Sequence, residues 1–323
     1  MRPASEGALR TRVYVDGYNL YYGCLKNTAD KWLDLRALVV RLLANVPYER
    51  SGERVNYEFC APTIKYFTAP ILSAFARSND SVICQSQYHA ALRGHLGKEL
   101  QIITGYHDAR PARAHVWVES KAAAGCPVVD IWKLEEKQSD VALALHAFCD
   151  AVLDEIDQVI VMTNDSDFAP AMQMIRQHTS VVLGLIAPIR QGDGRSRVNR
   201  ELNKHAHWTR THILDEEFAA SQLAPMVRLE GGAVHKPLSW YPCPELLIPI
   251  YEEARRVRGS NGAARRWLNE PCKQLGNRVP IEMCSSQESA LEVLEYMRRY
   301  AMESCADRKT PGRQASPAHA QGG

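Results

Sequence analysis

The sequence lacks any apolar run long enough to cross a membrane. Spanning the hydrocarbon core takes about 18 or more consecutive apolar residues, and no stretch of the 323 residues approaches this length. The first residues, MRPASEGALRTR, also lack the apolar centre of a signal peptide. These absences argue against a membrane-embedded or exported protein, so we expect a cytoplasmic one.

Paired cysteines are also missing. The nine cysteines are scattered and no two of them form a CxxC pair, so the sequence predicts reduced thiols and no zinc site. The net charge is only +2, and affinity for nucleic acid therefore has to be sought in local patches. No Gly-rich turn of the GxGxxG form is present, which argues against a dinucleotide site.

The sequence does contain an alternation of short apolar strands and amphipathic helices. Two continuous apolar runs, 159–163 and 181–187, are typical of strands buried on both faces. This alternation predicts an α/β fold with a mainly parallel sheet flanked by helices. Further strands are expected at 12–16, 64–68, 100–105 and 128–132, and helices at 33–43 and 139–156.

The composition of the sequence changes after residue 218. We expect the α/β domain to occupy residues 10–218, followed by a linker containing proline and glycine at 219–243. A helical module is expected at 244–304. The remaining residues, 305–323, are polar and rich in Gly, Pro and Ala, and we predict that they are disordered.

Four aspartates occupy positions that a parallel sheet would bring to one edge. Asp16 ends the first strand, and Asp165 and Asp167 follow the strand at 159–163. Asp140 opens the helix that precedes this strand. Ligands of open α/β sheets bind at the carboxyl ends of the strands. Four carboxylates at that edge repel one another unless a cation lies between them.

A divalent cation would relieve this repulsion, because Mg²⁺ prefers oxygen ligands. We therefore predict that the four carboxylates hold Mg²⁺ or Mn²⁺. Asn19 and Ser166 are polar neighbours that could hold ligands or waters. An aspartate before a helix is most often an N-cap. That alternative accounts for Asp140, or for one of the pair after the strand, but not for the set of four.

The motifs that carry these acids resemble the NYN domain, a PIN-like nuclease family. DGYNL, KQSD with the helix VALALHAF, and TNDSDFAPAM follow one another in the order of that family, and the resemblance covers about residues 10–215. It implies a PIN-like, Rossmannoid three-layer domain with Asp16, Asp140, Asp165 and Asp167 as catalytic metal ligands. The implied reaction is hydrolysis of RNA phosphodiester bonds, which needs no Ser, His or Cys nucleophile.

A basic stretch, residues 189–210, follows the last apolar run. If that strand lies beside the acidic edge, basic side chains of the stretch could bind RNA phosphates. A solvated loop and helix face is the alternative, and both interpretations stay open. The candidate RNA-binding residues are Arg190, Arg195, Arg197, Arg200 and Lys204.

The C-terminal part is similar to the toxin-binding domain of the Xre/MbcA/ParS antitoxin family. The resemblance lies in residues 264–301 and implies a helical module that binds a protein partner or a second copy of the chain through 244–304. A helical cap on the main domain is the alternative. The motif consists of Trp267, Leu268, Leu275, Gly276, Arg278 and Pro280.

Two functions compete with the metal-dependent ribonuclease. The opening VYVDGYNLYYGCL also resembles NYN-type proteins labelled 6-hydroxy-3-succinoylpyridine 3-monooxygenase, an NADH-dependent hydroxylase of nicotine breakdown. The acidic DGYNL turn would repel the pyrophosphate of NADH, so this alternative ranks second. A catalytically silent, antitoxin-like regulator ranks third, because it requires a vestigial acidic site.

Overall fold

The computed structural model describes residues 7–44, 48–50, 53–76, 79–194 and 197–307. The chain divides into two compact units, Met1–Lys236 and Pro237–Gly323. No helix within the described ranges combines the length and the apolar character needed to span a bilayer.

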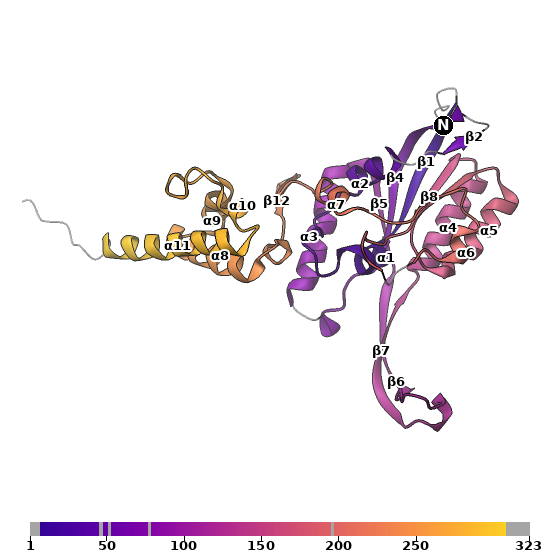
Figure 1. Cartoon of the computed structure of the whole chain (residues 1–323), viewed down its shortest axis with the longest axis horizontal. Coiled ribbons are helices and arrows are strands. Elements are labelled where there is room, and N and C mark those ends of the chain that lie inside the picture. Colours follow the sequence, from indigo (N-terminus) through magenta and orange to yellow (C-terminus); the bar gives the residue numbers. More distant parts are fainter. Residues whose placement is uncertain (1–6, 45–47, 51–52, 77–78, 195–196, 308–323) are drawn as a thin grey trace, which may run out of the picture. The chain divides into compact units, whose positions relative to one another are not determined.

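A six-stranded sheet forms the centre of the first unit (Figure 1). Its strands lie in the order β10-β9-β8-β1-β4-β5, and all neighbouring strands are parallel. Every residue of β8 and β9 is buried, as their continuous apolar sequences predict. The expected α/β class with a mainly parallel sheet is therefore confirmed. The strands are β1 (Ala8–Asp16), β4 (Asn56–Thr68), β5 (Leu100–Thr104), β8 (Gln158–Met162), β9 (Val182–Ile186) and β10 (Trp208–Arg210).

Helices cover both faces of this sheet (Figure 1). One face carries α2 (Leu35–Ala44), α3 (Asn79–Leu96) and α7 (Asp215–Ala219), and the other carries α4 (Ser139–Val152), α5 (Ala169–His178) and α6 (Arg200–Asn203). Buried side chains of α4 and α5 pack against Tyr14, Val159 and Leu183 of the sheet. The helix expected over 139–156 ends earlier, because Asp154 adopts a left-handed conformation with φ of 56°.

Between β5 and α4 the chain leaves the sheet as a two-stranded antiparallel arm. The strands β6 (Tyr106–His115) and β7 (Val128–Lys137) pair along their whole length, and Figure 1 shows the arm extending away from the sheet. The strand expected at 128–132 thus runs on to Lys137 and belongs to the arm. Gly105 at the base is required, because a Cβ there would lie 2.2 Å from the Lys137 carbonyl oxygen.

The first unit continues through most of the segment expected to be a linker. The hairpin of β11 (Met226–Leu229) and β12 (Gly232–His235) packs against α3. The Trp32 indole N–H donates to the Ala224 carbonyl at 2.8 Å, and Leu223 is buried. The boundary between the units therefore lies at residue 236 and not at 218, because the later residues complete the packing around Trp32 and α3.

The second unit is a helical module with its own core. Trp267, Leu268 and Leu275 of the antitoxin-like motif are buried in that core, so these three residues contribute to the packing of the module. The last helix ends at Asp307, three residues beyond the expected limit. Residues 308–323, which make up most of the expected disordered tail, lie outside the described residues. The helices are α8 (Pro244–Arg258), α9 (Asn261–Asn269), α10 (Pro280–Met283) and α11 (Gln287–Asp307).

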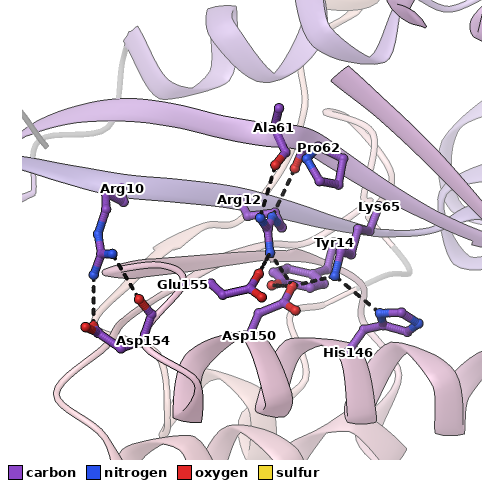
Figure 2. Close-up of polar contacts among 10 residues, drawn as sticks. All are labelled: Arg10, Arg12, Tyr14, Ala61, Pro62, Lys65, His146, Asp150, Asp154 and Glu155. Carbon is purple, nitrogen blue, oxygen red and sulfur yellow. Dashed lines mark hydrogen bonds and ion pairs between the residues drawn. The ribbon is translucent and has the colours of Figure 1, made fainter. Parts of the chain in front are cut away.

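A buried ionic cluster joins α4 to the sheet (Figure 2). Asp150 of α4 accepts hydrogen bonds from the side chains of Arg12 at 2.7 Å, Tyr14 at 2.5 Å and Lys65 at 2.6 Å. Burial alone would raise the pKa of Asp150, but the bonds from Lys65, Tyr14 and Arg12 lower it below its usual value. The cluster therefore fixes α4 against β1 and β4.

Replacing Asp150 with Asn should destabilise the protein strongly. The substitution leaves the buried cation Lys65 without its carboxylate and leaves Arg12 paired only with the partly exposed Glu155. Breaking a buried ion pair in this way costs about 3–5 kcal/mol. Asp154→Asn is the matched control, because Asp154 is 85% exposed and a surface pair contributes at most about 1 kcal/mol. Denaturant unfolding at neutral pH measures both losses, and equal losses would contradict this role of the cluster.

The loss should also depend on pH. The pKa of Asp150 is lower in the folded than in the unfolded protein, so its carboxylate stabilises the fold above the unfolded pKa of about 3.9. This contribution disappears as the pH falls through the folded pKa. The difference in unfolding free energy between the wild type and Asp150→Asn should therefore shrink in acid, below about pH 4.

Candidate functional site

The carboxyl ends of β1 and β8 meet where the order of the strands reverses. The chain continues from β1 through α2 to β4 on one side, and from β8 through α5 to β9 on the other, so the two connections diverge between β1 and β8. This topological switch point is where open α/β sheets bind ligands. Asp16 is the last residue of β1, and the Thr163–Asn164–Asp165 turn follows β8 directly.

Asp16 is only 8% exposed, and hydrogen bonds hold both of its carboxylate oxygens. Oδ1 accepts from the backbone N–H of Asn19 at 2.9 Å, so Asp16 caps α1 (Gly17–Leu20). Oδ2 accepts from the hydroxyl of Thr163 at 2.8 Å. Gly17 allows the helix to start directly after the strand, because a Cβ there would lie 2.6 Å from the Phe67 carbonyl oxygen.

Hydrogen bonds also connect the turn after β1 with the turn after β8. The backbone N–H of Asn164 donates to Oδ1 of Asn19 at 2.9 Å. The backbone N–H of Asp165 donates to the Thr163 hydroxyl oxygen at 3.2 Å, and Oδ1 of Asp165 accepts from the N–H of Asp167 at 3.0 Å. The N-cap interpretation therefore holds for Asp165, but its bond occupies one carboxylate oxygen only.

The four predicted aspartates act on one another electrostatically. Burial, followed by the charges of Asp140 and Asp165, raises the pKa of Asp16 to about 6 against the opposing effect of its two hydrogen bonds. Burial and the charges of Asp165 and Asp167 raise the pKa of Asp140, in the first turn of α4. The structure thus gathers all four carboxylates at one edge of the sheet. We call this group, together with Glu136, the acidic rim.

Glu136, near the inner end of β7, is a fifth carboxyl group at the same place. Burial, and then the charges of Asp140 and Asp16, raise its pKa to about 7. Its Oε1 atom is buried and has no hydrogen-bond partner among the described residues. A polar atom in this condition is costly unless a ligand, water or ion satisfies it.

Glu136 is not among the predicted site residues, because the strand was expected to end at residue 132. The alternation of residues after position 132 was the signal that the strand continues to Lys137. Glu136 pairs with His107 on one face of the arm. Glu135 lies on the opposite face, where Lys133 and Lys137 lower its pKa to about 2. Two adjacent glutamates therefore have opposite pKa shifts, because only one of them faces the aspartates.

Among the described residues, the charges with the largest effect on the acidic rim are negative. The charged groups that most affect the pKa values of Asp16, Asp140 and Glu136 are themselves carboxylates. Within the described residues, no three His, Cys, Asp or Glu side chains are arranged to hold a metal ion. Mg²⁺ often takes only one or two carboxylates and keeps several waters, so oxygen donors with an unsatisfied buried Oε1 fit such an ion.

The two predicted polar neighbours differ in their positions. Asn19 connects the two turns through its bond to Asn164. Ser166 is exposed at the start of the short 3₁₀ helix η5 (Ser166–Phe168). Asn19 therefore holds the backbone that positions the aspartates, whereas nothing in the described structure ties Ser166 to them.

The predicted RNA-binding residues also separate into groups. The contacts of Arg190 argue against a role in RNA binding, because its guanidinium forms ion pairs with Asp30 and Asp215 and donates to the Cys24 carbonyl. These bonds tie three parts of the first unit together and leave the side chain 20% exposed. Arg190 is thus a structural residue.

Lys204 gives no support to the prediction, and Arg195 is left untested. Lys204 forms an ion pair with Glu201 on the surface. The charge of Glu201 offsets that of Lys204 and weakens its attraction for a phosphate. Arg195 lies outside the described residues.

Arg197 and Arg200 are exposed, and hydrogen bonds connect the segment that carries them to the turn after β8. Asn164, in the turn after β8, donates from Nδ2 to the Arg197 carbonyl at 3.0 Å. Its Oδ1 accepts from the backbone N–H of Asn199 at 2.8 Å. The basic segment is therefore fastened to the residue that precedes Asp165.

Aromatic side chains surround the helix that follows Asp16. The rings of Tyr18 and Tyr22 stack with centroids 6.0 Å apart, and His107 of the arm meets Tyr18 edge-on at 5.6 Å. Tyr22 is 60% exposed. Such a surface can stack against a nucleobase or another flat heteroaromatic ring.

Two family models and one curated protein match this chain. Residues 10–207 match the NYN domain model, and residues 253–301 match the antitoxin Xre/MbcA/ParS C-terminal toxin-binding domain. The 6-hydroxy-3-succinoylpyridine 3-monooxygenase HspA of Pseudomonas putida (strain DSM 28022 / S16) is 42% identical over 305 residues, which cover 93% of this chain and 97% of that protein.

A solved structure of a protein of unknown function from Vibrio parahaemolyticus RIMD 2210633 has a TM-score of 0.37 and 18% identity, covering 68% of this chain and 100% of that one. The resemblances recognised in the motifs are confirmed by the family models and by the relative from Pseudomonas putida. Since the first family model matches more than half of the sequence, the chain belongs to the NYN domain family.

Proposed function

We propose that this protein is a metal-dependent ribonuclease with Mg²⁺ or Mn²⁺ at the acidic rim. The observation that carries the proposal is the group of carboxylates at the switch point, with a buried Glu136 oxygen that has no partner among the described residues. The nuclease-type fold of the NYN family supports it. A bound divalent ion polarises a phosphoryl oxygen and lowers the pKa of a coordinated water.

The side chains of the acidic rim would hold the ion, and the surrounding residues would orient these side chains. Asp16 is oriented in advance by its bonds to Asn19 and Thr163. Asp140 lies in the first turn of α4, where the helix dipole favours a negative charge. Arg197 and Arg200 would bind RNA phosphates and offset the repulsion between those phosphates and the carboxylates of the acidic rim.

Asp16→Asn should abolish most RNA cleavage while the fold persists. The substitution removes one charge but keeps the size of the side chain, and removing one electrostatic interaction of this kind lowers turnover by about 100-fold or more. The assay is cleavage of labelled single-stranded RNA with Mg²⁺ or Mn²⁺, and circular dichroism checks the fold. Asp154→Asn, at the opposite end of the sheet, should cleave at the wild-type rate.

Cleavage that survives both Asp16→Asn and EDTA would refute the ribonuclease proposal. Loss of cleavage in the Asp154→Asn control as well would show that the effect is not specific to the rim.

Hydroxylation of a hydroxypyridine is the second candidate. It is favoured by the identity with the monooxygenase-named relative over nearly the whole of both chains, and the Tyr18–Tyr22 surface could accept such a ring. The position after β1 argues against NADH as its cofactor. Dinucleotide folds place a Gly-rich turn there for the pyrophosphate, whereas this chain places the carboxylate of Asp16 there.

A parallel assay separates the two candidates. Purified protein is incubated with NADH and a hydroxypyridine, and the absorbance of NADH is followed. The ribonuclease proposal predicts no oxidation of NADH that depends on the pyridine. Such oxidation, without any cleavage of RNA by the same preparation, would favour the second candidate.

Arg197→Ala and Arg200→Ala should weaken RNA binding and reduce its dependence on salt. Removing one cation that binds a phosphate should lower the slope of log K against log salt by about 0.7 for single-stranded RNA. Fluorescence anisotropy in EDTA measures binding without cleavage. Arg176→Ala is the control, because Arg176 donates to the His205 carbonyl. An unchanged slope in both variants would exclude these arginines as phosphate ligands.

We also propose that residues 244–304 bind a protein partner or a second copy of the chain. The match to a toxin-binding domain supports this proposal. Because Trp267 and Leu268 of the motif are buried, a partner would contact other side chains of the module. Ile248 and Leu291, which are 41% and 43% exposed, are apolar candidates.

A further inference from the structure

The outer half of the β6–β7 arm carries an apolar face. Ala112 pairs with Ile131, and Ala114 pairs with Val129. Val116 continues the same ladder, since its N–H donates to the Pro127 carbonyl at 2.8 Å. Val129 and Ile131 are 44% and 38% exposed, and Val116 is 38% exposed. No charged residue interrupts this part of the face.

This apolar face points away from the body of the first unit. The opposite face holds His107, which contacts Tyr18 at 5.6 Å, and Trp132, whose ring lies 5.9 Å from that of Phe75. It also holds Glu136, on which the charges of Asp140 and Asp16 act. Because successive residues of a strand alternate between faces, the apolar side chains lie on the face without these contacts.

The charges of the arm indicate what kind of partner it suits. Residues 106–137 contain five basic and five acidic side chains, so the formal charge is zero. Four of the cations pair with carboxylates of the arm itself: Arg110 and Lys137 with Glu135, Arg113 with Asp130, and Lys133 with Glu135. A neutral surface of this kind does not suit RNA, and a patch with both signs can complement a copy of itself.

The two outer edges of the arm differ in their capacity to pair with another strand. Pro111 removes a backbone donor from β6, and proline is found in sheets mainly on edge strands. β7 contains no proline and reads VVDIWKLEEK. A long apolar strand with an open edge is a template for pairing with another chain, and a two-stranded ribbon alone is only marginally stable in water.

We propose that the outer half of the arm is the contact between two copies of this chain, with β7 of one copy pairing antiparallel to β7 of the other about a two-fold axis. The product is a four-stranded sheet in which both β6 strands, with Pro111, stay at the edges. Val129 and Ile131 of both copies then become neighbours on one face, where cross-strand apolar pairs stabilise a sheet.

Analytical ultracentrifugation of the full chain tests the proposal. The wild type should dimerise reversibly, and the double variant Val129→Lys/Ile131→Lys should weaken the dimer at least tenfold, because four like charges would come together. Leu145→Lys/Val152→Lys is the matched control. It changes two apolar residues of α4 that are 56% and 49% exposed, and it should dimerise like the wild type.

A wild type that stays monomeric across the accessible concentrations would overturn the proposal. So would a dimer that survives the Val129→Lys/Ile131→Lys substitution, since the contact would then lie elsewhere.

Hydrogen exchange provides a second readout that does not depend on a variant folding. In the wild type, backbone amides of β7 should exchange more slowly as the protein concentration rises, because the open edge becomes paired. Protection of β7 that does not change with concentration, although the protein dimerises, would equally overturn the proposal.

Discussion

Repulsion between carboxylates at the ends of β1 and β8 is the constraint on which the rest of the site depends. The fold places Asp16 in a buried position and adds Asp140, Asp165 and Glu136 around it, so that burial and like charges raise pKa values together. The hydrogen bonds that Asp16 accepts from Asn19 and Thr163 oppose this rise in its pKa but do not cancel it. A bound cation would relieve the remaining repulsion, and the proposed metal site rests on this argument.

The surrounding structure keeps the repelling groups in place. Thr163 and Asn19 bridge the turns that follow β1 and β8. Farther along the same strand and helix, Asp150 ties α4 to β1 and β4 through Arg12 and Lys65. The carboxylate of Asp150 is fully compensated, whereas that of Asp16 is not. The interface between α4 and the sheet therefore contains the ionic cluster around Asp150, which stabilises the fold. It also contains the carboxylates around Asp16, which repel one another.

The sequence predicted the parts of the structure that depend on local pattern. Strand ends in a parallel sheet are set by apolar runs, so Asp16 and Asp165 could be placed from the sequence at one edge. Glu136 could not, because its position depends on the length and register of the arm. The structural role of Arg190 could not be predicted, because its ion-pair partners Asp30 and Asp215 are distant from it in sequence. The domain boundary was displaced for a similar reason, since the contacts of Trp32 with residues near 224 are not local.

Thermal unfolding of the wild type and of Asp16→Asn, with and without Mn²⁺, tests the central claim most directly. The pKa of Asp16 is raised to about 6, so at neutral pH its ionised carboxylate destabilises the metal-free fold. In EDTA, Asp16→Asn should therefore melt at a higher temperature than the wild type. Mn²⁺ should raise the melting temperature of the wild type by more than that of Asp16→Asn, because it binds the folded rim. A wild type that melts above Asp16→Asn in EDTA and does not respond to Mn²⁺ would contradict the account.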